Sequence, residues 1–150
     1  MIFKLILLLV AFTSSAFARL GETFQQCQAR YGAPVQIQTP TVIFRKGKWS
    51  VYVTFFQGKA DSISYIKIPD QDDRFAFTEN EIEAFMKSNF GERDYYSLPA
   101  PRGKGQAWST KDNEILSTLY DGCLMFRTRA AGERSIAADK AKADQSVKGF

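Results

Sequence analysis

The first feature that bears on chemistry is an absence, because the chain of 150 residues contains no histidine. Ser-His-Asp and Cys-His catalysis are therefore excluded within the chain, as are metal sites that need an imidazole ligand. Glu79, Glu81 and Glu83 lie close together in sequence, but their pattern is typical of the polar N-terminal part of an amphipathic helix. We therefore expect no catalytic group, no metal ion and no cofactor.

Two charged loops are candidate ion sites. Residues 70–73 include three aspartates, but Arg74 and Phe75 stand where an EF-hand calcium loop requires a ligand and a glycine. We interpret this stretch as a solvated loop before a helix. Arg102-Gly103-Lys104-Gly105 combines two cations with accessible backbone N–H groups and could cradle an anion. A flexible basic loop is the alternative interpretation.

The N-terminal residues 1–18 have the pattern of a secretory signal peptide. Lys4 precedes the apolar run 5–12, and Ala16-Phe17-Ala18 forms a small-residue cleavage site. The apolar run is too short to span a membrane comfortably, so we predict an exported protein, secreted or periplasmic, with no membrane span after cleavage. Its net charge of +4 is spread along the chain without a basic run, and we therefore expect no nucleic-acid partner.

Cys27 and Cys123 are the two cysteines of the chain. Export would place them in an oxidising compartment, where a widely spaced pair in a small domain favours a disulfide. The alternative is two buried free thiols, because an unpaired cysteine packs like a small hydrophobic residue.

Hydrophobic periodicity and turn residues predict an α+β fold, with helices packed on one face of an antiparallel sheet. Capping boxes at Thr23 and Thr78 begin two helices, which Gly32 and Gly91 end. Strands are expected over residues 35–38, 41–45, 49–56, 62–68, 106–110, 115–120 and 123–129. We assign residues 19–129 to one α+β domain, in which residues 20–69 and 77–129 are candidate repeats of a helix plus three strands. Chance agreement of two such halves is the alternative interpretation. Residues 130–150 are rich in Ala, Lys and Asp, and we expect a flexible tail, with a frayed helix as the alternative.

The first predicted helix carries a resemblance to known families. Gly21, Thr23, Gln26, Gly32 and Pro34 match the opening of small exported α+β domains. These include the outer-membrane-assembly lipoproteins and the domains of beta-lactamase inhibitory protein. The resemblance implies a helix on a short antiparallel sheet. The chain lacks their lipidation cysteine and their second helix, and the matching positions are cap and core residues, so no binding residue is carried over.

Aromatic residues suggest a function. In residues 49–56 the large apolar side chains at odd positions form one face of the predicted strand. Tyr52 and Phe56 add large aromatic groups to the other face as well. A half-buried strand normally has one polar face, so we predict an interaction surface there, extended by Arg102 and Lys104. The alternative is that a helix covers this face of the strand. The leading hypothesis is a non-catalytic binding or assembly module for another exported or envelope protein. The alternatives are a secreted hydrolase that uses carboxylates and a structural envelope protein.

Overall fold

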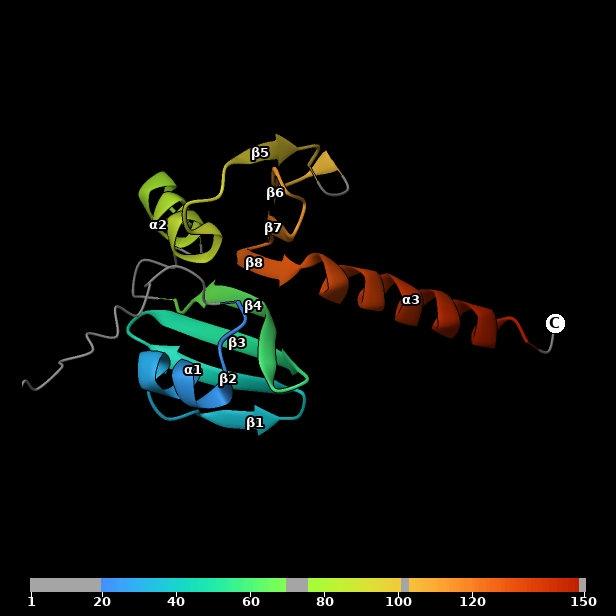
Figure 1. The fold of residues 1–150 in the computed structure, drawn as a ribbon, viewed down its shortest axis with the longest axis horizontal. Coiled ribbons are helices and arrows are strands. Elements are labelled where there is room, and N and C mark those ends of the chain that lie inside the picture. The colour runs from blue at the N-terminus through green and yellow to red at the C-terminus, as the bar shows by residue number, and fades with distance from the viewer. Residues whose placement is uncertain (1–19, 70–75, 101–102, 149–150) are drawn as a thin grey trace, which may run out of the picture.

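The computed structural model describes residues 20–69, 76–100 and 103–148, so the predicted leader, the acidic loop and Arg102 lie outside the described residues. These residues form an α+β fold, as predicted, with one antiparallel sheet in the order β1-β2-β3-β4-β8-β7-β6-β5 (Figure 1). The helices are α1 (Phe24–Tyr31), α2 (Glu79–Phe90) and α3 (Arg129–Ser146). The strands are β1 (Gln36–Gln38), β2 (Thr41–Lys46), β3 (Trp49–Phe56), β4 (Lys59–Lys67), β5 (Tyr95–Leu98), β6 (Gln106–Thr110), β7 (Ile115–Tyr120) and β8 (Cys123–Thr128).

Both predicted capping boxes are confirmed. The Thr23 hydroxyl accepts the Gln26 backbone N–H at 3.3 Å, and the Gln26 side chain accepts the Thr23 backbone N–H at 2.8 Å. Thr78 and Glu81 make the same reciprocal pair at the start of α2. Each box satisfies backbone donors that have no partner inside the helix, which explains why the two helices begin at these residues.

The strand order is symmetric about the β4–β8 pair. Each half consists of one helix followed by four strands, and β4 and β8 join the halves into one sheet. The hairpins β3–β4 and β7–β8 turn on equivalent residue pairs, Gln57-Gly58 and Asp121-Gly122, all with positive φ. Each half has four strands where the candidate repeat was assigned three. In the first half residues 35–38 and 41–45 belong to two separate strands that pair with each other, and in the second half β5 is additional.

The strand missing from the prediction is β5, whose sequence is Tyr-Tyr-Ser-Leu followed by Pro99. It lies at the edge of the sheet and pairs only with β6. Its first three residues are exposed, so no alternation of buried and exposed side chains marked it in the sequence.

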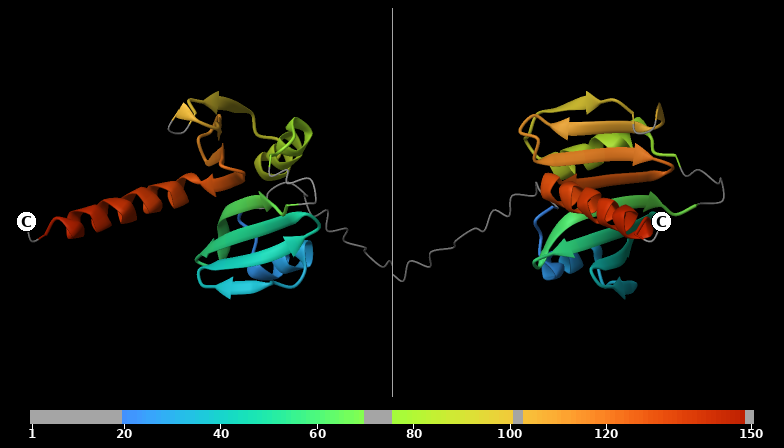
Figure 2. Two further views of the ribbon diagram at one scale, coloured as in Figure 1. Left: turned by 180° about the vertical axis from the view of Figure 1, so that it is seen from behind. Right: turned by 90° about the vertical axis from the view of Figure 1, so that its right-hand side faces the viewer.

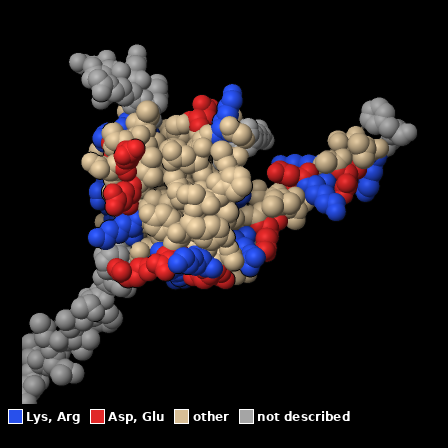
Figure 3. All heavy atoms as spheres, turned by 90° about the horizontal axis from the view of Figure 1, so that it is seen from above, with Lys and Arg blue, Asp and Glu red and all other residues tan. Residues whose placement is uncertain are grey.

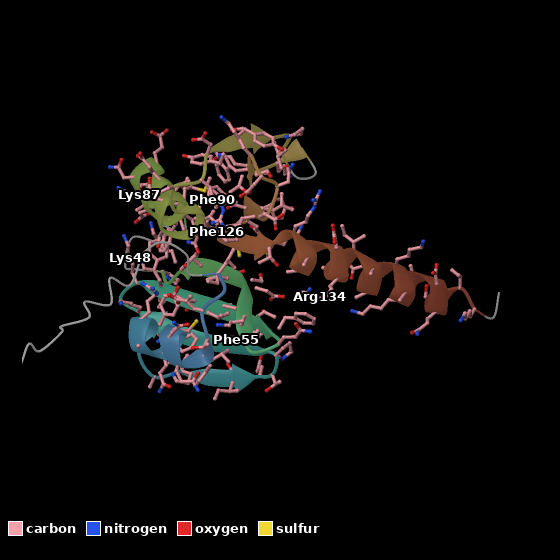
Figure 4. The ribbon with its side chains drawn as sticks, in the orientation of Figure 1. Lys48, Phe55, Lys87, Phe90, Phe126 and Arg134 are labelled. Atoms are coloured by element: carbon pink, nitrogen blue, oxygen red, sulfur yellow. The ribbon has the colours of Figure 1, made fainter. Side chains whose placement is uncertain are left out.

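The helices α1 and α2 cover one face of the sheet. Phe24 of α1 lies 6.3 Å from Phe44 between ring centroids, and Phe85 of α2 lies 4.2 Å from Tyr65. Phe90 and Phe126 meet edge to face at 5.5 Å between α2 and β8 (Figure 4). These contacts place the hydrophobic core between the two helices and the sheet.

The helix α3 corrects two expectations, because residues 129–146 form a helix where a flexible tail was expected, and this helix does not share the face of α1 and α2. It lies in front of the sheet in the right-hand view of Figure 2, whereas α1 and α2 lie behind the sheet. The Thr128 hydroxyl caps its start by accepting the Ala131 N–H at 3.1 Å. Alanine and lysine favour helix without tertiary contacts, and Gly132 is the helix's one buried residue. The helix therefore projects from the body beyond its first turns.

The predicted disulfide is also wrong, because both cysteines are free. Cys27 lies in α1 and is fully buried on the helix-covered face. Cys123 pairs with Ile66 in the β4–β8 register, and residues directly opposite each other share a face of the sheet. Ile66 alternates with the core residue Tyr65, so Cys123 lies on the other face and the sheet separates the two sulfur atoms.

We expect both thiols to be labelled by iodoacetamide in denaturant without reductant. In the native protein Cys123 should react before Cys27, because burial, reinforced by the neighbouring Glu22, raises the pKa of Cys27 to about 12 and only the thiolate reacts. Mass spectrometry after timed alkylation measures both rates. Labelling that appears only after reduction would contradict the free-thiol structure.

Candidate functional site

The candidate site is the face of the sheet opposite α1 and α2, which we call the open face. Strand registers assign side chains to it: Tyr52 lies opposite Ser64, Ser64 opposite Met125, and Met125 opposite Thr118. The open face thus runs through both halves of the sheet. Its larger apolar members include Ile43, Tyr52, Phe56, Ile66, Met125 and Tyr120.

The two aromatic residues predicted for an interaction surface both belong to the open face. Tyr52 is half-buried, and Phe56 is 43% exposed near the β3–β4 turn. Tyr120, which the sequence analysis did not single out, is 42% exposed at the equivalent end of β7. The alternation of β7 is the signal that could have found it, because Tyr120 occupies the same face as Leu116 and Thr118.

The basic loop lies away from Tyr52 and Phe56, although it lies next to Tyr120, since a Cβ at Gly105 would lie 3.4 Å from the Tyr120 Cα. Lys104 is exposed before β6, and β6 is four strands away from β3 in the sheet order. Four steps of about 4.8 Å separate them by about 19 Å. Gly105 is packed against β7, since a Cβ there would lie 2.2 Å from the Leu119 carbonyl oxygen. The close approach of the β7 backbone therefore explains why residue 105 is glycine, and no bound anion is needed to account for it.

The open face carries no carboxylate at its regular strand positions in the described residues. Its cations there are Arg45, Arg127 and Lys59, which lies opposite Phe56. The nearest acidic residue is Asp61, at the irregularity between β3 and β4, and it forms an ion pair with Arg134 of α3. Seen from the end that carries β5, uncharged surface fills the centre of the molecule, and charged residues gather at the margin and along α3 (Figure 3).

A groove lies between the open face and the first turns of α3. Its volume is about 410 Å³, and its walls include Phe56, Ser62, Met125, Arg127 and Arg134. The guanidinium of Arg134, whose side chain is labelled in Figure 4, lies over the Phe56 ring, 3.7 Å from the centroid, and pairs with Asp61. Sequence reasoning missed Arg127 and Arg134, because the helix that forms one wall was expected to be a flexible tail.

A second hollow, of about 280 Å³, opens on the side of α1 and α2. Its cations are already engaged: Arg30 pairs with Glu22, and Lys46 donates to the Arg30 carbonyl oxygen. The hydroxyls of Tyr31 and Tyr65 lie 3.2 Å apart at its buried side. These contacts join α1 to the sheet, and we assign the hollow a structural role.

The carboxylates are arranged as structural ion pairs. In the described residues every Asp and Glu is exposed except Glu22, Asp61 and Glu81, and each of these three pairs with Arg or Lys. Burial opposes ionisation of Glu81, but hydrogen bonds from Lys48, Lys67 and the Thr78 backbone outweigh it and lower its pKa to about 2. Such a group stays ionised and cannot act as a general acid near neutral pH. This arrangement gives the carboxylate-hydrolase alternative no support.

No group of three or more Cys, Asp and Glu side chains within residues 20–69, 76–100 and 103–148 gathers where it could hold a metal ion. None of the helices in that part of the chain has the length and apolarity needed to cross a membrane. Comparison with known proteins identified no matching family model, no matching curated protein and no matching solved structure.

Proposed function

We propose that the protein is an exported, non-catalytic binding module that recognises another exported or envelope protein through its open face. The single observation that carries the proposal is the open face itself: a continuous surface with half-exposed aromatic residues in both halves and no carboxylate at its strand positions among the described residues. Interface cores are enriched in Tyr, Phe, Met and Arg and depleted of acidic residues, and the open face has this composition.

The test is site-specific photo-crosslinking in cells that produce the protein. A photoreactive phenylalanine at Tyr52 or Tyr120 should yield an adduct with the same protein, because the two positions share one face in different halves. The same group at Glu83, which is exposed on α2, is the matched control and should yield no such adduct. Equal cross-linking from Glu83, or different adducts from the two open-face positions, would contradict the proposal.

With the captured protein purified, Tyr52→Ala is expected to weaken affinity about tenfold, because truncating a central interface aromatic typically costs 1–2 kcal/mol or more. Because Tyr52 is partly buried and its truncation also removes contacts within the sheet, circular dichroism first verifies that the variant is folded. Calorimetric titration measures the affinity, and Glu83→Ala is the control. Unchanged affinity would show that the open face is not the interface.

A further inference from the structure

The groove beside α3 contains a cation that has no counter-ion. Arg127 forms no ion pair in the part of the chain that the structure describes. Its neighbour Arg134 is neutralised by Asp61. The groove therefore holds one unpaired guanidinium beside one complete ion pair. A partly buried guanidinium without a counter-ion is free to form a charge-assisted hydrogen bond with an anionic ligand.

Packing holds Arg127 in place before any ligand arrives. A Cβ at Gly132 would lie 3.4 Å from the Arg127 Nε and 3.6 Å from its Cζ. The backbone of α3 thus lies close to the guanidinium, and even an added Cβ would make only ordinary van der Waals contact with it. A half-buried arginine fixed on one side loses less conformational entropy when it binds, which is the advantage of a preorganised site.

The remaining groove walls specify what else the ligand presents. Ser62 and Thr54 add hydroxyl groups, and Phe56 and Met125 add apolar surface. A volume of about 410 Å³ is enough for one or two amino-acid side chains but not for a folded domain. The groove therefore fits a short extended segment that carries one negative charge next to an apolar residue.

We propose that this groove binds an acidic side chain, Asp or Glu, from an extended segment of the partner protein, with its carboxylate held by Arg127. The planar guanidinium matches a carboxylate in a bidentate arrangement, which gives both attraction and orientation. The apolar residue beside the acidic one packs on Met125 and Phe56. The inference rests on the proposed function, because it names the chemistry that the open face recognises.

The experiment is an NMR titration of the full protein with two peptides, acetyl-Leu-Glu-Leu-amide and acetyl-Leu-Gln-Leu-amide, at neutral pH. The glutamate peptide should shift the Arg127 side-chain N–H and the Met125 methyl signals saturably. The glutamine peptide, which keeps the shape and lacks the charge, should bind at least about tenfold more weakly. Equal affinities, or no saturable shift at either group, would overturn the inference.

Two variants separate the groove from general electrostatics. Arg127→Met removes the charge while preserving length and should abolish the preference for the glutamate peptide. Arg45→Met removes an open-face cation that lies three strands away on β2, and should leave the preference unchanged. Equal effects of the two variants would overturn the assignment to Arg127. If neither peptide binds but the photoreactive group at Tyr52 still cross-links to the partner, only the groove proposal is refuted. If the cross-linking itself is absent, the open face is not the interface.

Discussion

Replacing Gly105 by alanine should lower the free energy of unfolding by about 3 kcal/mol. Gly105 has φ of +79°, and a Cβ would meet the Leu119 carbonyl oxygen at 2.2 Å. Backbone atoms of β7 cannot move aside as a flexible side chain can, so the β6–β7 pairing must shift. Urea denaturation followed by circular dichroism measures the loss.

Gly103→Ala is the matched control for this prediction. Gly103 has a similar φ of +71°, but a Cβ there would meet nothing within 4 Å. It should therefore show only the cost of the left-handed conformation, about 1 kcal/mol. If the two variants lose equal stability, the close approach of Gly105 to β7 does not exist in solution.

The second large effect is expected for Glu81→Ala, at about 2–4 kcal/mol near neutral pH. The substitution removes the capping-box carboxylate of α2 and leaves the Lys67 ammonium, whose side chain is 9% exposed, without its acidic partner at 2.9 Å. Lys67 keeps a hydrogen bond to the Ala76 carbonyl oxygen, at 2.8 Å, and a cation–π contact with Trp49, 5.5 Å from the ring centroid. Because Glu81 ties α2 to strands of the first half, its loss also weakens the joint between the halves.

Glu79→Ala and Glu83→Ala are the controls, because both side chains lie on the same helix and are exposed. Each should cost less than about 0.5 kcal/mol, as surface substitutions usually do. Losses as large as that of Glu81→Ala would show that helix propensity or overall charge, and not the contact with Lys67, causes the effect.

The stabilisation by Glu81 should also depend on pH in a defined direction. Its pKa lies at about 2 in the folded protein and at about 4.5 when unperturbed, so the unfolded chain binds the proton more readily. The contribution is complete above about pH 4.5 and disappears as the pH falls toward 2. The stability difference between wild type and Glu81→Gln should therefore shrink over this interval, and a constant difference would contradict the assignment.

Local features of the chain were predictable because short-range interactions determine them. The capping boxes at Thr23 and Thr78, and the alternation of residues 49–56, follow from neighbouring residues alone, and the structure has them. The order of helices and strands is enough for the α+β class. The aromatic residues Tyr52 and Phe56 were found in the same way, since alternation assigns them to one face of β3.

Long-range features could not be predicted in this way. β5 is held by backbone pairing with β6, and its exposed Tyr-Tyr-Ser sequence shows no periodicity. The cysteines looked like a pair in sequence, yet the register of β4 with β8 puts the sheet between them. The groove forms only where α3 lies beside β8, so no local sequence pattern marked Arg127 and Arg134 as its lining residues.

Composition and short-range spacing were enough for the two capped helices α1 and α2, most of the strands, the α+β class and the absence of histidine chemistry, because each depends on residue types or on residues a few positions apart. Tertiary structure alone decided that β4 and β8 join the two halves, that one face stays open, and that α3 stands beside it with Arg127 unpaired. The physical reason is that strand pairing and helix packing bring together residues that are far apart in sequence. Asp61 and Arg134, for example, are 73 positions apart, and no local conformational preference predicts their contact.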